Sequence, residues 1–276
     1  MDYDPIKDRL GAAFTRSPLL HRAFFRALDA VFLRAWWVHR EVRRIVEALP
    51  RDRSVRVLDA GTGFGQYAYF LLRSYPHVEV TAVDVKADYL DAARQFFDRT
   101  PFGGRIAFRE HDLTEPLPEV DRFDLALSVD VMEHIEDDRA VFRTFHRALR
   151  PGGSVVVNTP SDRGGSGITE AGEESFIGEH VREGYAPAEL RAKLEAAGLE
   201  VERWAYTYGR YGSAGWHLLV KWPILALNRS MALGALLPLY YLPALPAGLA
   251  LNALDVRTDN AEGTGLLMTA RKPPAL

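Results

Sequence analysis

The sequence predicts an α/β fold built around an open, mostly parallel sheet. From Val55 onward, short β-branched segments alternate with segments of helical periodicity, a pattern typical of βαβ units. The chain has 276 residues, of which 47% are hydrophobic and 26% are charged, and this suits one such domain with additional segments. There are no cysteines, so disulfides and thiolate chemistry are excluded.

An amphipathic helix is predicted ahead of the sheet, over residues 18–49 of an N-terminal extension that spans residues 1–50. Pro18 suits its first position and Pro50 ends it. Its apolar residues recur at steps of three and four and form one stripe. Residues 16–56 contain ten arginines and four acids, so the other side of the helix is basic. Two interpretations stay open: a surface for phosphates or anionic lipid, and an ordinary solvated helix face.

Seven strands and four further helices are predicted for the α/β core, which we place at residues 51–208 with a last strand and tail at residues 263–276. The strands are expected at residues 55–59, 78–84, 105–111, 123–129, 154–159, 199–208 and 265–271. The helices are expected at residues 65–75, 86–99, 137–149 and 187–197. Residues 160–185 form a long polar loop, and loops of that length in compact domains are usually functional or disordered.

A glycine-rich turn follows the first strand. The strand ends on Asp59, and Gly61, Gly63 and Gly65 come next. Without a Cβ, such a backbone turns tightly and approaches a ligand closely. A dinucleotide fingerprint would place its third glycine at position 66, where this chain has Gln66. This spacing, together with the lack of a Tyr-x-x-x-Lys motif in the middle of the chain, disfavours a nicotinamide dehydrogenase.

Polar residues also follow the next three strands. Asp84 ends the second strand, where a carboxylate can accept hydrogen bonds from ribose hydroxyls. Asp112 follows the third strand and could accept a hydrogen bond from an exocyclic amine. The fourth strand leads into the polar turn Ser128-Val129-Asp130-Val131-Met132-Glu133-His134. Any one of these acids alone could be an ordinary residue at a strand end.

In this order and spacing, the four segments resemble class I S-adenosylmethionine (SAM)-dependent methyltransferases over about residues 50–208 and 263–272. The resemblance implies a Rossmann-like sheet of seven strands, with the last strand antiparallel between the fifth and the sixth, and SAM as the cofactor. It also implies the cofactor contacts: Asp59, Gly61, Thr62, Gly63 and Gly65 around the methionine part, Asp84 and Val85 at the ribose, Asp112 and Leu113 at the adenine, and Ser128 to Asp130 beside the methyl donor.

Methyl transfer from a sulfonium needs an aligned acceptor and, for oxygen or carbon acceptors, a group that removes a proton. The candidate bases are His180 in the long loop, His134 after the fourth strand, and Asp130. For His134 a local structural role at a helix start is the alternative. The His-x-Arg-x-x-Tyr cluster from His180 resembles the substrate-side segment of many relatives, so Arg182 and Tyr185 are candidate substrate-binding residues. No set of residues has metal-ligand spacing, so we expect a metal-independent enzyme.

Residues 209–262 form an apolar insertion between the sixth and seventh strands. From Ser230 to Leu254 there is no charged residue, over a length greater than the ~20 residues that span a bilayer. Both ends of the insertion join one sheet, so a single crossing is excluded. Prolines at 223, 238, 243 and 246 should bend or end helices. We therefore expect short helices in an interfacial hairpin, roofing the sheet edge at which open α/β sheets bind ligands.

Together these features predict a SAM-dependent methyltransferase of a hydrophobic or lipid-like acceptor, cytoplasmic and peripheral on the inner membrane face. No secretory signal is expected, because the chain begins Met-Asp-Tyr-Asp-Pro without an early apolar run. One alternative is a soluble small-molecule O- or N-methyltransferase with the insertion as lid or dimer interface, and another is a non-catalytic SAM-binding protein. A monomer and a homodimer both remain open. The net charge of −3 and the lack of a basic-aromatic groove argue against nucleic-acid substrates.

Overall fold

The computed structural model describes residues 18–164 and 181–274. Its elements along the chain are α2 (Pro18–Val31), α3 (Leu33–Ala48), β1 (Val55–Ala60), α4 (Gln66–Ser74), β2 (Val78–Asp84), α5 (Ala87–Phe97), η1 (Gly103–Arg105), β3 (Ile106–Glu110), β4 (Phe123–Val129), η2 (Met132–His134), α6 (Asp138–Ala148), β5 (Leu149–Pro160), α7 (Pro187–Ala196), β6 (Glu200–Thr207), α8 (Arg210–Trp216), η3 (His217–Lys221), α9 (Trp222–Arg229), η4 (Met231–Leu236), α10 (Leu237–Arg257) and β7 (Gly265–Arg271).

The seven strands form one sheet in the order β3-β2-β1-β4-β5-β7-β6. Strand β7 runs antiparallel to both β5 and β6, and the remaining neighbours are parallel. The predicted Rossmann-like sheet, with its last strand inserted between the fifth and the sixth, is therefore confirmed. Gly265 pairs with Pro160 on one side and with Thr207 on the other, so the insertion leaves the sheet and returns to it at the carboxyl edge of the parallel strands.

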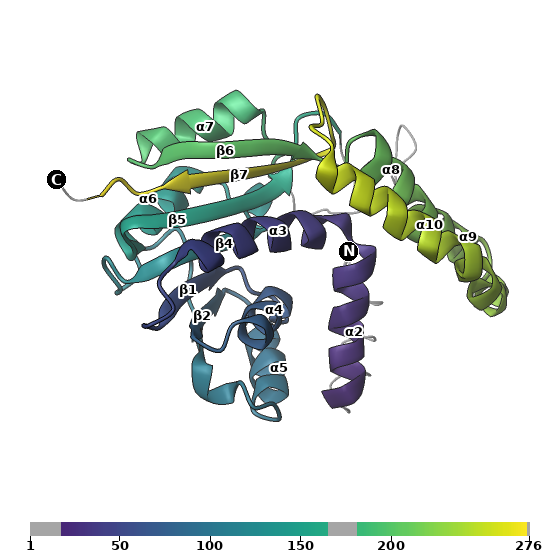
Figure 1. Cartoon of the computed structure of the whole chain (residues 1–276), viewed down its shortest axis with the longest axis horizontal. Helices are drawn as coiled ribbons and strands as arrows, with labels where there is room; N and C mark the ends of the chain where they lie inside the picture. The colour runs from purple at the N-terminus through teal and green to yellow at the C-terminus, as the bar shows by residue number, and fades with distance from the viewer. Residues whose placement is uncertain (1–17, 165–180, 275–276) are drawn as a thin grey trace.

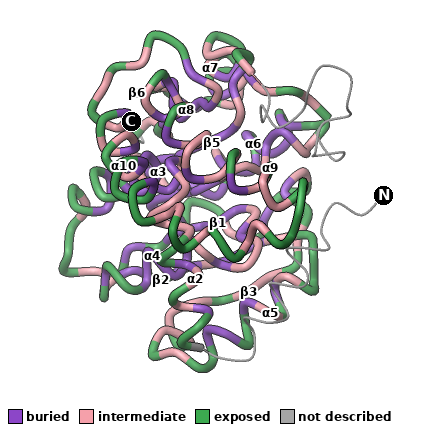
Figure 2. The backbone as a smooth tube through the Cα atoms, turned by 90° about the vertical axis from the view of Figure 1, so that its right-hand side faces the viewer, coloured by how far each residue is buried: buried purple, intermediate pink, exposed green. Residues whose placement is uncertain are grey.

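Helices cover both faces of this sheet (Figure 1). Helices α2, α3, α4 and α5 supply the apolar side chains of one core, including Trp37, Phe70 and Phe97. Helices α6 and α7 supply those of the other, including Phe142 and Leu190. The strands β1, β4 and β5 contribute to both cores because successive side chains of a strand point to opposite faces. Figure 2 shows buried segments in the interior, where the strands and the helices that cover them meet.

The predicted single helix over residues 18–49 is wrong, because the chain forms two helices that meet at an elbow. Phe32 separates α2 from α3 in an extended conformation, with φ −86° and ψ 114°. On one side of the elbow, Phe25 of α2 packs against Tyr69 and Phe96, with ring centroids 5.5 Å and 5.3 Å away. On the other side, α3 lies across the sheet beside β5, β6 and β7. One straight helix could not make both contacts, and no proline marks the break.

The insertion is a helical hairpin, as predicted. Segments α8, η3 and α9 run away from the sheet, and η4 and α10 return (Figure 1). The expectation that prolines limit it to short helices is wrong for α10, which continues through Pro243 and Pro246. An interior proline costs ~3 kcal/mol, and close packing between the two arms offsets it. A Cβ on Gly248 of α10 would lie 2.4 Å from Leu219 Cγ, so the glycine permits that packing.

Candidate functional site

The glycine-rich turn after β1 has one open position between two packed ones. Gly61, Gly63 and Gly65 have φ values of 77°, 53° and 83°, in the left-handed region that favours glycine. An added Cβ would lie 2.3 Å from Val131 Cγ2 at Gly61 and 2.8 Å from Phe97 Cε2 at Gly65, whereas at Gly63 it meets no atom within 4 Å. The backbone at Gly63 is therefore the part of the turn that a ligand can approach.

Two carboxylates support this turn. Asp84 Oδ2 accepts a hydrogen bond from the Gly63 N–H at 2.8 Å, and its Oδ1 accepts one from the Lys86 N–H at 3.0 Å. Asp59 is buried, and the Thr62 hydroxyl donates to it at 2.6 Å. Burial raises the pKa of Asp59 to about 6, and the neighbouring Asp84 charge acts in the same direction. Asp84 thus lies against the turn instead of pointing away from it.

The structure brings the other predicted cofactor residues to the ends of neighbouring strands. Val85 is exposed directly after β2, whereas Leu113 is buried after β3. Asp112 accepts hydrogen bonds from the backbone N–H and the hydroxyl of Thr114, at 2.9 Å and 2.8 Å, and these bonds lower the pKa of Asp112. Because β3, β2, β1 and β4 are adjacent and parallel, these residues lie along one sheet edge.

Ser128 lies near the end of β4, beside the end of β1 that leads into the glycine-rich turn. The side chain is fully buried, and its hydroxyl has no hydrogen-bond partner among the described residues. An unpartnered buried hydroxyl costs ~1–3 kcal/mol. The orphaned hydroxyl, the open position at Gly63 and the carboxylate of Asp84 fit the polar groups of SAM.

An ion pair that the sequence analysis did not foresee lies beside the predicted methyl-donor position. The guanidinium of Arg34, at the start of α3, donates to the Asp130 carboxylate, and this charge helps raise the pKa of Arg34 against the opposing effect of burial. The Arg34 backbone N–H donates to the Tyr208 hydroxyl at 3.2 Å. Asp130 and Tyr208 have positive φ values, 53° and 54°. The N-terminal helices, the β4 turn and the start of the insertion therefore meet at this point.

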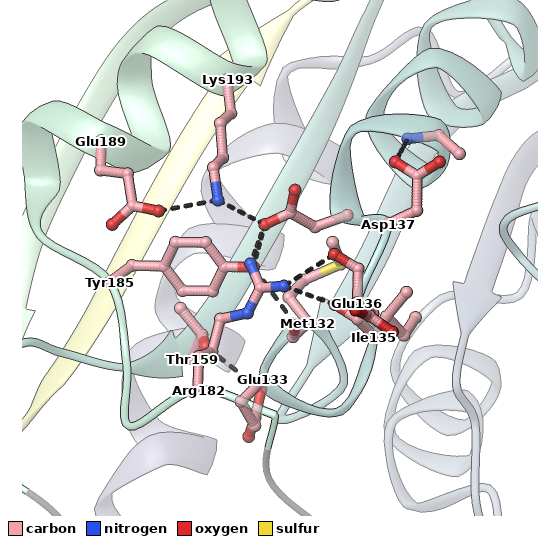
Figure 3. Close-up of polar contacts among 12 residues, drawn as sticks. Met132, Glu133, Ile135, Glu136, Asp137, Thr159, Arg182, Tyr185, Glu189 and Lys193 are labelled. Carbon is pink, nitrogen blue, oxygen red and sulfur yellow. Dashed lines mark hydrogen bonds and ion pairs between the residues drawn. The ribbon is translucent and has the colours of Figure 1, made fainter.

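Arg182 and Tyr185 lie in a network that holds the β4 turn against α6 and α7 (Figure 3). Arg182 donates to Asp138, to the Tyr185 hydroxyl at 2.7 Å and to the Ile135 carbonyl at 2.7 Å. The Tyr185 hydroxyl donates to Asp138 at 2.6 Å, Lys193 donates to the same carboxylate at 2.7 Å, and Tyr185 is fully buried. In this arrangement, both predicted substrate residues are engaged with the protein itself.

Of the two histidines predicted as bases, only His134 belongs to the described residues. His134 is half-buried at the end of η2, where its backbone N–H donates to the Val131 carbonyl. His180 lies outside the described residues. Within residues 18–164 and 181–274, no group of three or more His, Asp or Glu side chains could hold a metal ion.

Glu133 is a buried acid beside Asp130, and it makes stability depend on pH. Burial, helped by the Asp130 charge, raises the pKa of Glu133 to about 8, and the Thr159 hydroxyl donates to it at 3.2 Å. The folded state therefore binds more protons than the unfolded state between pH ~4.5 and ~8, so stability falls as pH rises through that window. We expect Glu133→Gln to gain stability relative to the wild type by up to ~1.4 kcal/mol per pH unit.

Urea unfolding at pH 5, 6.5 and 8.5 measures this effect. Glu136→Gln, an exposed neighbour of the same charge, should show a constant difference from the wild type. A constant difference for Glu133→Gln as well would disprove the buried, proton-bound state of Glu133.

The order of the strands and the residues at the carboxyl edge of the sheet indicate a class of protein. An open, mostly parallel sheet with a glycine-rich turn after its first strand, and a carboxylate at the end of the second, is typical of nucleotide-cofactor-binding α/β domains. The comparisons with known proteins then give the particular type. Residues 57–153 match the methyltransferase domain family, and the chain carries a class I SAM-dependent methyltransferase domain with SAM as its cofactor.

Individual relatives agree with this family. The chain is 33% identical over 121 residues to a ubiquinone biosynthesis O-methyltransferase of Methylocella silvestris, covering 41% of this chain and 46% of that protein. It is 30% identical over 135 residues to a malonyl-[acyl-carrier protein] O-methyltransferase of Paenibacillus sp., covering 44% and 49%. It therefore spans less than half of either relative. The SAM complex of Haemonchus contortus phosphoethanolamine N-methyltransferase 2 shares the fold, with a TM-score of 0.58 and 20% identity over 84% of this chain and 51% of that one.

Proposed function

We propose that this protein transfers the methyl group of SAM to a hydrophobic, lipid-like acceptor at a membrane surface. The observation that carries the proposal is an exposed apolar hairpin rooted at the same sheet edge as the cofactor turn. SAM supplies a methyl group already activated by the positive charge of its sulfonium. The chain has to bind SAM at Gly63 and Asp84, align the acceptor and, for an oxygen or carbon acceptor, accept a proton.

The returning arm of the hairpin, η4 and α10, is apolar and largely exposed. Residues Met231–Arg257 are long and apolar enough to cross a membrane by length and composition, and only 11% of their most apolar window is buried. Leu239 and Leu242 are 68% and 71% exposed. Apolar surfaces of this size are rarely left in water without a binding role. Because both ends of the hairpin return to one sheet, we propose that it dips into one leaflet and does not cross the bilayer.

Backbone hydrogen bonds inside the hairpin also suit an apolar environment. In η3, the Trp222 N–H bonds to the His217 carbonyl instead of the Leu218 carbonyl, and Pro223 has no N–H to offer Leu219. The Tyr240 and Tyr241 hydroxyls donate to the Leu218 and Leu219 carbonyls, both at 2.7 Å. In lipid every backbone polar group needs a partner within the protein. The two tyrosine hydroxyls supply the hydrogen bonds that the Leu218 and Leu219 carbonyls do not receive from the helix backbone.

The chain offers three candidates for the proton acceptor. Asp130 and His134 follow β4 at the cofactor edge, and His180, outside the described residues, precedes α7 in the sequence. The carboxylate of Asp130 accepts a charged hydrogen bond from Arg34, which favours an orienting role for Asp130 and leaves the two histidines as the proposed bases. Arg182 and Tyr185 are proposed to act on the acceptor by fixing the β4 turn, since they hold η2 and α6 together.

Vesicle flotation tests the membrane part of this proposal. We expect the wild type to float with anionic vesicles, and Leu239→Glu/Leu242→Glu to reduce the bound fraction at least tenfold, because burying each leucine contributes ~1.5–3 kcal/mol. Val120→Glu changes an exposed apolar residue at the amino edge of the sheet and should float like the wild type. SAM affinity, measured by calorimetry, should be unchanged in both variants.

The catalytic part is tested with SAM that carries a labelled methyl group and with total membrane lipid as acceptor. Label that partitions into the organic phase supports a lipid-like acceptor. A wild-type protein that stays wholly soluble at low salt, monodisperse without detergent, would defeat the membrane proposal. A dimer that dissociates in Leu239→Glu/Leu242→Glu would assign the hairpin to a second copy of the chain instead.

A further inference from the structure

A basic cavity lies at the α2–α3 elbow, on the face of the sheet that α2, α3 and α4 cover. It has a volume of about 490 Å³ and is bounded by residues of α2, α3, α4 and the end of α10. Four of its lining residues are arginines, Arg26, Arg40, Arg43 and Arg73, and one is an acid, Asp29. Four positive charges against one negative charge make it a site for an anion.

Three of these arginines belong to the basic segment of residues 16–56 and Arg73 belongs to α4, and within the described residues all four differ from Arg44 and Arg53 in forming no ion pair. Arg44 pairs with Glu41 at 2.7 Å, and Arg53 pairs with Asp124 at 2.7 Å. Among the residues that the structure describes, Arg26, Arg40, Arg43 and Arg73 form no ion pair with a carboxylate.

Aromatic rings hold three of these guanidinium groups near the cavity. The Arg40 guanidinium carbon lies 4.2 Å from the Trp37 ring centroid, and that of Arg43 lies 5.7 Å from the Phe70 ring. The Arg73 group lies 5.7 Å from the Tyr69 ring. A guanidinium over an aromatic face keeps its N–H donors at its edge. Packing therefore positions these three guanidinium groups, and Arg40 is additionally held by a hydrogen bond to the Val256 carbonyl.

A buried histidine forms part of the cavity lining. His39 is 8% exposed and stacks on Phe70, with ring centroids 3.5 Å apart. Its Nε2 has no hydrogen-bond partner among the described residues, and the nearest carboxylate, Asp29 Oδ1, lies 3.6 Å away. Burial, with the nearby Arg43 and Arg73 charges, lowers the pKa of His39 to about 3. The ring therefore stays neutral, and the positive charge of the cavity comes from its arginines.

We propose that this cavity binds a phosphate group, held by the forks of Arg26, Arg40, Arg43 and Arg73. Phosphate presents several oxygens in different directions, and arginines that line the cavity from three helices can donate to more than one of them. The cavity volume fits one small anionic group and not a polymer. The ligand is either a soluble phosphate or the headgroup of an anionic lipid. Arg40 also donates to the Val256 carbonyl at the end of α10, so the cavity lies at the root of the apolar hairpin.

Two binding measurements test the cavity and distinguish its ligand sources. One is calorimetry with inorganic phosphate at constant ionic strength. The other is cosedimentation with phosphatidylcholine vesicles, with and without phosphatidylglycerol. The test variant is Arg43→Gln/Arg73→Gln. The control is Arg143→Gln/Arg191→Gln, which removes the same charge from an exposed position on α6 and a half-buried position on α7.

We expect the test variant to lose at least tenfold in affinity and the control to stay within twofold of the wild type. A loss in the phosphate titration assigns a soluble ligand. A loss only with phosphatidylglycerol vesicles assigns a lipid headgroup. Equal behaviour of the two variants in every measurement overturns the site, whether both retain binding or both lose it. The inference does not depend on methyl transfer, and SAM affinity should be the same in all three proteins.

Discussion

Replacing Gly63 by alanine is expected to weaken SAM binding at least a hundredfold while leaving the protein folded. The new Cβ would meet no protein atom within 4 Å, so the fold loses only the cost of a left-handed alanine, about 1–2 kcal/mol. The same Cβ would project into the space that we assign to the cofactor. A hundredfold loss corresponds to about 2.7 kcal/mol. Calorimetry with SAM, together with thermal unfolding, measures the two effects separately.

Gly152→Ala is the matched control for this variant. Gly152 also has a positive φ, 79°, and its added Cβ would contact only the flexible end of Arg271, at 3.4 Å. It lies in β5 on the amino side of the sheet, where Ser154 pairs with Leu125 near the start of β4. We expect a similar loss of stability with unchanged SAM affinity. SAM binding within threefold of the wild type in Gly63→Ala would remove the cofactor from this turn.

The sequence could not separate the three glycines of the turn. Gly61, Gly63 and Gly65 are chemically identical and equally spaced, and close approach of a ligand was the reason inferred for all of them. Only the fold shows that Val131 fills the space at Gly61 and Phe97 fills the space at Gly65. Short β-branched and apolar runs were sufficient for the strands, because burial on both faces leaves a local pattern: β2, β4 and β7 have the predicted bounds.

Long-range contacts explain what the sequence missed. Arg34 and Asp130 are 96 positions apart, and Arg34 and Tyr208 are 174 apart, so no periodicity or motif connects them. The elbow at Phe32 has the same origin. It depends on where α4 and α5 place Tyr69 and Phe96, and not on a local helix-breaking residue. The order of the strands likewise came from the resemblance to a known family and not from spacing.

The hairpin and the N-terminal helices form one structural unit with the site. Tyr208 precedes α8 and contacts Arg34, which pairs with Asp130 beside the predicted methyl-donor position. At the other end of the hairpin, the Asn252 amide donates to the Val31 carbonyl at the elbow, at 3.3 Å. A change in the position of the hairpin root would therefore move Arg34 and the β4 turn. Through these contacts, binding of the hairpin to its proposed membrane would change the position of Arg34 and Asp130.

Asp255→Ala is expected to destabilise the protein by about 2–5 kcal/mol, with the largest effect in the hairpin. Asp255 is fully buried, and it accepts hydrogen bonds from the Trp37 indole N–H and the Gly212 backbone N–H, both at 2.9 Å. Alanine would leave both donors buried without a partner, at ~1–3 kcal/mol each. Urea unfolding measures the total loss. Hydrogen exchange should show faster exchange of the amides of residues 210–257 than of those in the sheet.

Two further variants separate this anchoring role from a general effect of charge. Asp259→Ala removes an exposed acid just beyond α10 and should change stability by less than 0.5 kcal/mol. Asp255→Asn keeps one acceptor oxygen and turns its amide N–H₂ toward the second donor, so its loss should lie between those of the other two variants. Unchanged exchange in the hairpin of Asp255→Ala would contradict the anchor. SAM should still bind to Asp255→Ala, because Gly63 follows β1, Asp84 ends β2, and neither residue contacts Asp255.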